Sequence, residues 1–195
     1  DGTEQTILLT GHYVNDVVVD DAHVYFTTYT SQTVYRMPKD GGPPTLIAHT
    51  QPNPVGLTLR GHDLFTTSWS NGQLRRISLL DKTVTTLATL PHSNLGGLAV
   101  DGDTFFAVGN GGAVYEYDTA TTTLATPGSG LVLADADSRY VYFGGSSRLG
   151  RVHRDTGAIE TFSTTGNTYG IAVDDRFIYW TNASTATINR MAKPL

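Results

Sequence analysis

The chain has 195 residues, of which 39% are hydrophobic and 16% charged; its formal net charge is −5 and it contains no cysteine. The acidic balance argues against a nucleic-acid partner, because phosphates call for a basic surface. The lack of cysteine excludes disulfides and thiolate metal sites. No run approaches the roughly 18 apolar residues that typify a membrane-spanning helix, so membrane insertion is not expected. The first residue is not Met and no signal-type segment follows it, as expected of a processed or trimmed chain.

The predicted elements are short strands rich in Val, Ile, Tyr, Phe and Thr, separated by Gly, Asp and Asn clusters. In chain order, a lone strand near residues 4–10 comes first and contains the pair Thr6-Ile7. Four complete groups of four strands follow, and then a group of three. The groups begin at 17–21 (VVVDD), 56–61 (GLTLRG), 97–102 (GLAVDG), 131–137 (LVLADAD) and 170–175 (GIAVDD).

The same order recurs within each group. An apolar first strand ends at a charged turn, and a second strand carries an aromatic residue. The third strand resembles TVYRM (residues 33–37), and the fourth contains Thr followed by an apolar residue. The aromatic residues repeat every 37 to 41 positions: Phe26, Phe65, Phe106, Phe143 and Trp180.

Four antiparallel strands repeated at about 40 residues are typical of a β-propeller blade. The sequence therefore predicts an all-β, five-bladed β-propeller that forms a single domain over residues 1–195. The fifth group, 170–191, lacks its fourth strand, and the N-terminal segment 4–10 has the matching pattern. We expect this segment to pair in the last blade and to close the ring. The alternative is five similar hairpins in an open stack or barrel.

Two units, 17–42 and 170–193, resemble YWTD-type and NHL-type propeller repeats, and IYWTN (residues 178–182) is the best local match. They look most like the divergent bacterial versions found in extracytoplasmic proteins and in the virginiamycin B lyase-like group. The resemblance implies the propeller fold and a secreted or cell-envelope location. YWTD propellers usually have six blades and the lyase type seven, so five is a departure. The lyase group works through inner His and Glu residues and magnesium. No matching His-x-Glu arrangement occurs here, so that activity is not carried over.

The order of the loops in the repeat predicts that they lie on two opposite faces of the propeller. The turns between strands 1 and 2 and between strands 3 and 4 form the bottom face, which holds every aspartate except Asp16. Turn chemistry explains this distribution, because Asp bonds readily to its own turn backbone. Calcium at these turns is the alternative, and otherwise no cofactor is expected.

The top face is neutral apart from Asp16 and Arg148, and it carries amides, hydroxyls and aromatic rings. Such a face suits a carbohydrate or another small neutral ligand. The sequence thus predicts a lectin-like binding module. The predicted ligand-binding residues are Tyr13, Tyr29, Asn53, Trp69, His92, Asn94, Asn167 and Tyr169. For Asn53, Asn94 and Asn167 the alternative is a cap on the turn into strand 1, and for the rings it is local packing.

Two other functions remain open from the sequence. One is a protein-interaction scaffold of the cell envelope. The other is a lyase or hydrolase in which His12, Asp16 and His92 meet at the channel mouth. A non-enzymatic protein is favoured, because paired carboxylates and known catalytic motifs are missing from the top face. His12, His49 and His92 stand at different offsets from the strands, so no metal site is predicted. A monomer is expected.

Overall fold

The computed structural model describes residues 6–162 and 166–194, and these residues form strands and no helix. The first sheet contains β1 (Val14–Val19), β2 (His23–Thr28), β3 (Thr33–Pro38) and β4 (Thr45–Ala48). The second contains β5 (Pro54–Arg60), β6 (Asp63–Ser68), β7 (Gln73–Ser78) and β8 (Val84–Thr89). The third contains β9 (Leu95–Asp101), β10 (Thr104–Gly109), β11 (Val114–Tyr117) and β12 (Thr121–Ala125).

The fourth sheet contains β13 (Leu131–Ala136), β14 (Tyr140–Gly145), β15 (Arg148–His153) and β16 (Ile159–Phe162). The fifth contains β17 (Thr168–Val173), β18 (Phe177–Asn182) and β19 (Thr187–Ala192). All neighbouring strands are antiparallel. The prediction of an all-β protein with repeated antiparallel sheets is confirmed.

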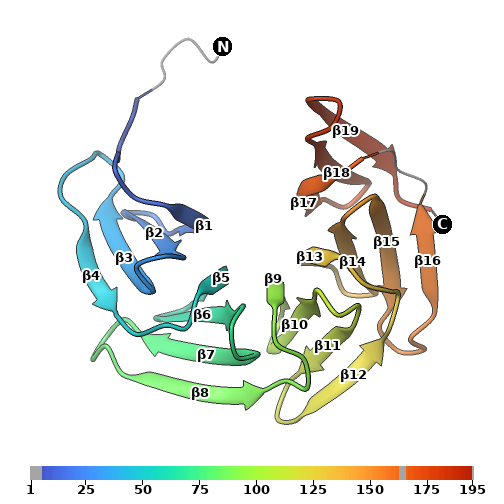
Figure 1. The fold of residues 1–195 in the computed structure, drawn as a ribbon, viewed down its shortest axis with the longest axis horizontal. Helices are drawn as coiled ribbons and strands as arrows, with labels where there is room; N and C mark the ends of the chain where they lie inside the picture. Colours follow the sequence, from blue (N-terminus) through green and yellow to red (C-terminus); the bar gives the residue numbers. More distant parts are fainter. Residues whose placement is uncertain (1–5, 163–165, 195) are drawn as a thin grey trace.

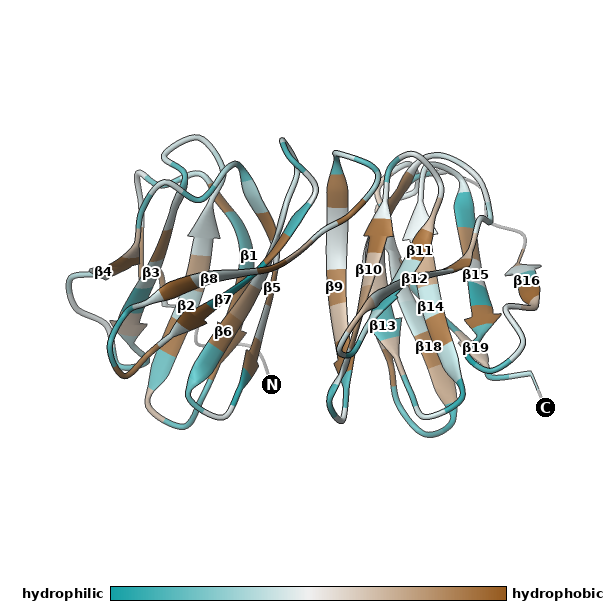
Figure 2. Cartoon of the chain, turned by 90° about the horizontal axis from the view of Figure 1, so that it is seen from below, coloured by the Kyte–Doolittle hydropathy of each residue, from teal (hydrophilic) through white to brown (hydrophobic). Residues whose placement is uncertain are grey.

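The five sheets stand around a central space in the order of the chain, and their first strands face that space (Figure 1). This is the five-bladed β-propeller architecture. Apolar residues concentrate along the strands, while the loops at both ends are mostly polar (Figure 2). A small antiparallel sheet must bury an apolar face to be stable in water, and here adjacent blades cover that face for each other.

Strand pairing defines which aromatic residue is equivalent in each blade. The second-strand residue opposite the third-strand Arg or Glu is Tyr25, Phe65, Phe106, Tyr142 or Tyr179. In the first, fourth and fifth blades this residue lies one position before the one chosen from the sequence. The difference arises because both rings of YF, YF and YW fit the aromatic pattern, and only the register separates them.

Large buried side chains fill each junction between blades. Phe65 and Phe105, for example, lie with ring centroids 4.3 Å apart between the second and third sheets. Between the fourth and fifth sheets, Tyr142 and Leu149 pack against Ile178. Half-buried Trp180, one of the repeated aromatic residues, packs in the same junction.

Ring closure by the N-terminal strand is a wrong prediction for the described part of that segment. Residues 6–10 form no strand, Ile7 is 80% exposed, and the fifth sheet has three strands among the described residues. Glu4 and Gln5 lie outside these residues. Figure 1 shows an open arc with the first and fifth sheets at its ends.

Candidate functional site

Four aromatic side chains surround one concavity of about 440 Å³ at the top of the central channel: Tyr13, Tyr29, Trp69 and Tyr169. All four are among the predicted ligand-binding residues. Asn15, Val55 and Val132 complete the lining, so no charged side chain borders it. We call this seven-residue concavity the aromatic mouth. Tyr13 and Tyr169 are 71% and 66% exposed, whereas Tyr29 and Trp69 are half-buried.

The repeat itself positions two of these rings. Tyr29 and Trp69 each follow the second strand of their blade, four residues after the equivalent core residues Tyr25 and Phe65. The Trp69 amide donates to the Asn53 carbonyl (3.0 Å), and the Trp69 carbonyl accepts from the Asn94 amide (2.5 Å). The indole is therefore carried by a backbone that is bonded on both sides.

The three predicted asparagines hydrogen-bond the equivalent loops of their blades through their main chains. The Asn53, Asn94 and Asn167 carbonyls each accept from the loop that follows the second strand of their blade, at 2.9 to 3.0 Å. Asn53 and Asn94 have φ values of 45° and 64°, a left-handed conformation that Asn tolerates better than most residues. The Asn53 side chain also donates to the Tyr29 carbonyl (3.3 Å) and accepts from Ser70. These contacts support the turn interpretation, and none of the three asparagines lines the aromatic mouth.

The three residues considered for catalysis have separate partners. His12 packs edge-on against Phe26 and Tyr35 of the first sheet. His92 hydrogen-bonds the Tyr115 hydroxyl of the third sheet. Asp16 lies in the channel wall. In the part of the chain that the structure describes, no contact joins two of these three side chains.

Below the aromatic mouth, a second concavity of about 400 Å³ is lined by the first strands and includes Asp16 and Asp135. The Asp16 carboxylate accepts from the Leu57 amide (2.7 Å) of the next blade, and the Asp135 carboxylate accepts from the Val173 amide (2.8 Å). Burial raises the pKa of both carboxyls, although the backbone hydrogen bonds oppose that shift. Each therefore ties adjacent first strands together.

The prediction that Asp135 lies in a bottom turn is wrong: Asp135 lies in β13 and lines the channel concavity. The sequence could not separate Asp135 from Asp137, because residues two apart on a strand point to the same face. Asn15, Val55 and Val132 were also missed, since nothing in their sequence neighbourhood marks a channel mouth.

Three bottom-face aspartates make the same hydrogen bonds in three equivalent turns. Asp20, Asp137 and Asp174 each accept two backbone amides of their own turn and a tyrosine hydroxyl at 2.8 Å. This supports turn chemistry for these three. Within residues 6–162 and 166–194, no group of three or more His, Cys, Asp or Glu side chains has an arrangement that could hold a metal ion.

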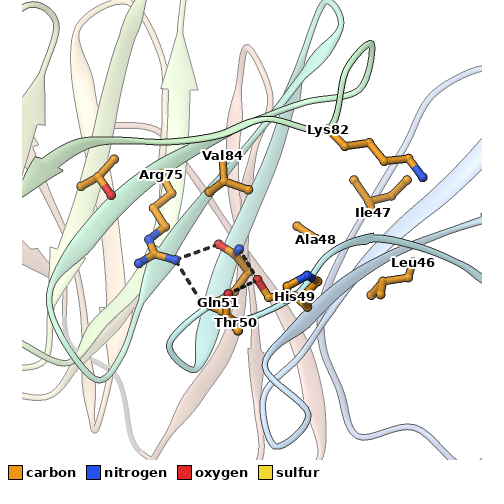
Figure 3. Close-up of a pocket in the computed structure, with 10 residues that line it drawn as sticks. Leu46, Ile47, Ala48, His49, Thr50, Gln51, Arg75, Lys82 and Val84 are labelled. Atoms are coloured by element: carbon orange, nitrogen blue, oxygen red, sulfur yellow. Dashed lines mark hydrogen bonds between the residues drawn. The ribbon is translucent and has the colours of Figure 1, made fainter.

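A third concavity, of about 540 Å³, lies on the outer wall between β4 and β8 (Figure 3). Apolar side chains of both strands line it together with His49, Arg75 and Lys82. Arg75 donates to neutral acceptors, namely the Thr50 carbonyl and the Gln51 and Gln73 side chains. Burial lowers the pKa of Arg75. Among the described residues, no carboxylate pairs with Arg75, Lys82 or His49.

Comparisons with known proteins agree with this architecture. No family model and no curated protein matches the sequence. A chain of a nidogen/laminin complex aligns with a TM-score of 0.80 and 16% identity, over 92% of this chain and 75% of that one. A streptogramin B lyase aligns with a TM-score of 0.73 and 15% identity, over 97% and 72%.

A catalytically inactive virginiamycin B lyase from Staphylococcus aureus, solved with quinupristin, aligns with a TM-score of 0.77 and 19% identity, over 96% of this chain and 69% of that one. At these identities the likeness shows the fold alone. The described residues contain no helix long and apolar enough to cross a membrane. Repeat, register and structural likeness together show that the chain is a divergent β-propeller repeat protein.

Proposed function

We propose that this propeller is a binding module whose aromatic mouth takes a neutral carbohydrate. The observation that carries the proposal is the convergence of Tyr13, Tyr29, Trp69 and Tyr169 on one uncharged concavity. The C–H faces of a sugar ring stack on aromatic rings, and its hydroxyls bond to neutral amides and carbonyls. A volume of about 440 Å³ lies within the range of small-molecule sites.

The separation of His12, Asp16 and His92 supports binding over catalysis. Asp16 has both carboxylate oxygens engaged by backbone amides, which leaves it poorly placed as a general base. A lyase or hydrolase remains the weaker alternative, and a secreted or cell-envelope location is part of the same proposal.

The test is a broad glycan-binding survey followed by titration of each hit against variants. Trp69→Ala should weaken binding about tenfold or more, since the loss of one stacking ring costs on the order of 1.4 kcal/mol. Trp69→Phe should retain part of the affinity. Leu80→Ala is the matched control, because Leu80 is 77% exposed in a bottom turn. A survey without hits, or equal affinity for Trp69→Ala and the parent protein, would contradict carbohydrate binding.

The outer groove in Figure 3 favours a second candidate function, a protein-interaction scaffold. β4 is the outermost strand of its sheet, so one edge is open to an added strand. Arg75 and Lys82, which pair with no carboxylate of the described residues, suit an extended segment that carries carboxylates. We expect a synthetic peptide alternating Glu and Leu to bind, and Lys82→Glu to weaken that binding about tenfold. Equal binding of the uncharged Gln-Leu peptide would overturn this second candidate.

A further inference from the structure

The apolar face of the last blade is uncovered at a position that is buried in every other blade. The residue two places before the third-strand Arg or Glu that faces the aromatic residue is Val34, Leu74, Val114 or Leu149 in the first four blades, and each is at most 1% exposed. Its equivalent in the fifth blade is Ile188, which is 82% exposed. In the first four blades, the buried residue at this position packs against the blade that follows.

The first blade shows the opposite half of the same contact. Leu57 in β5 packs against the preceding blade and is 3% exposed. The equivalent residue of β1, Val17, is 53% exposed, and Val19 on the same face is 55% exposed. The two ends of the arc therefore expose the two complementary faces of a blade junction.

The charges at the ends are complementary as well. At two internal junctions, an aspartate at or just after the end of the first strand pairs with a cation that follows the third strand of the next blade: Asp101 with Arg154 (2.5 Å) and Asp137 with Lys193 (2.6 Å). The equivalent aspartate of the last blade is Asp174, and the equivalent cation of the first blade is Lys39. Across the described residues, neither forms an ion pair.

Backbone groups complete the pattern. β19 is the outer strand of a three-stranded sheet, whereas the other third strands each have a fourth strand beside them. Residues 6–10 contain the Thr-apolar pair typical of a fourth strand and lie unpaired just before the first blade. His12 packs on Phe26 and Tyr35, which holds the end of this segment against the first sheet.

We propose that these ends form a head-to-tail interface between two copies of this chain. The fifth blade of one copy docks on the first blade of the second copy. Ile188 covers Val17 and Val19, Asp174 faces Lys39, and residues 6–10 of the second copy lie along β19. A second copy is the favoured occupant because one chain carries both halves of the interface in the order used at its internal junctions. The contact is heterologous, so two copies close it if the rotation permits and longer assemblies form if it does not.

The experiment is light scattering coupled to size-exclusion chromatography over a range of protein concentrations. We expect the parent protein to self-associate. Ile188→Asp, which disables only the fifth-blade face, and Val17→Asp, which disables only the first-blade face, should each remain monomeric. Burying an unpaired charge should weaken association about a hundredfold. Both residues are exposed, so the monomer should fold normally by circular dichroism. Ile159→Asp, at an exposed site on β16, is the control and should self-associate like the parent.

Mixing the two monomeric variants distinguishes this interface from other contacts. Together they retain one intact face each, so a 1:1 heterodimer should form, and Lys39→Glu introduced into the Ile188→Asp partner should weaken it. A parent protein that stays monomeric at high concentration would overturn the proposal. A mixture that fails to associate would also overturn it. Restored association is diagnostic, because neither contact through another surface nor closure of the ring within one chain could be restored by mixing.

Discussion

The Lys193 ammonium lies 2.6 Å from the Asp137 carboxylate and joins the fifth blade to the fourth. Asp137 also accepts the Tyr142 hydroxyl and the Arg139 and Tyr140 amides. Burial acts to raise the pKa of Asp137, but these hydrogen bonds outweigh it and hold that pKa at about 2. A turn, a core tyrosine and a neighbouring blade thus depend on one charged carboxylate.

Asp137→Asn should lower the free energy of unfolding by about 2 kcal/mol at neutral pH. Because the folded-state pKa lies below the unfolded value of 3.8, the contribution is fully present above pH 3.8 and is lost as the pH falls toward 2. Urea unfolding of parent and variant across this window checks the prediction. The difference between them should shrink as the pH falls. Asp118→Asn, at an exposed turn, is the control, and a difference that does not vary with pH would contradict the linkage.

Gly96→Ala should destabilise the protein by about 2–3 kcal/mol, because the first strands of the third and fourth blades meet there. A Cβ at Gly96 would lie 2.6 Å from the Val132 carbonyl oxygen and 2.7 Å from its Cα. Gly170→Ala is a matched comparison: its Cβ would meet only the Thr181 side chain, at 3.2 Å, which can shift. Thermal unfolding should rank Gly96→Ala well below Gly170→Ala, and equal stability would show that the blades can separate at no cost.

The Asn53→Ala variant should have a free energy of unfolding about 1 kcal/mol lower than that of Asn53→Gly, since Ala is strained at a φ of 45°. If Asn53 serves the turn that carries Trp69, both variants should bind the ligand found for the aromatic mouth with affinity close to that of the parent. Chemical denaturation and ligand titration check the two statements separately. A Gly variant that is stable but fails to bind would instead assign the Asn53 amide to the ligand.

Arg151→Lys should cost about 2 kcal/mol of stability, because Lys cannot reproduce the planar guanidinium contacts. Arg151 is 3% exposed, donates to Glu160 (2.7 Å) and to the Pro194 carbonyl (3.0 Å), and lies 3.9 Å from the Tyr140 ring centroid. Arg190→Lys is the same change at the equivalent exposed site of the fifth blade and should stay within about 0.5 kcal/mol. Similar losses in calorimetry would mean that burial does not distinguish the two sites.

The local sequence pattern and the tertiary packing determine different features of this protein. The recurrence of Thr-apolar pairs, turn aspartates and aromatic strands predicted the number of blades and their strand order. These are local features, since each repeat must form the same turns and bury the same face. The pattern also placed Tyr13, Tyr29, Trp69 and Tyr169 on one face, because loop order in a propeller decides the face.

Tertiary structure decided the rest. Only the register shows that Tyr25 and not Phe26 is equivalent to Phe65, because a shift of one residue reverses the face of every side chain. Only the packing of adjacent blades places Asp135 in the channel and gathers four rings at one mouth. Only the tertiary structure shows that residues 6–10 form no strand and that the five sheets stand in an open arc, because pairing between distant segments depends on where the packed blades place them in space.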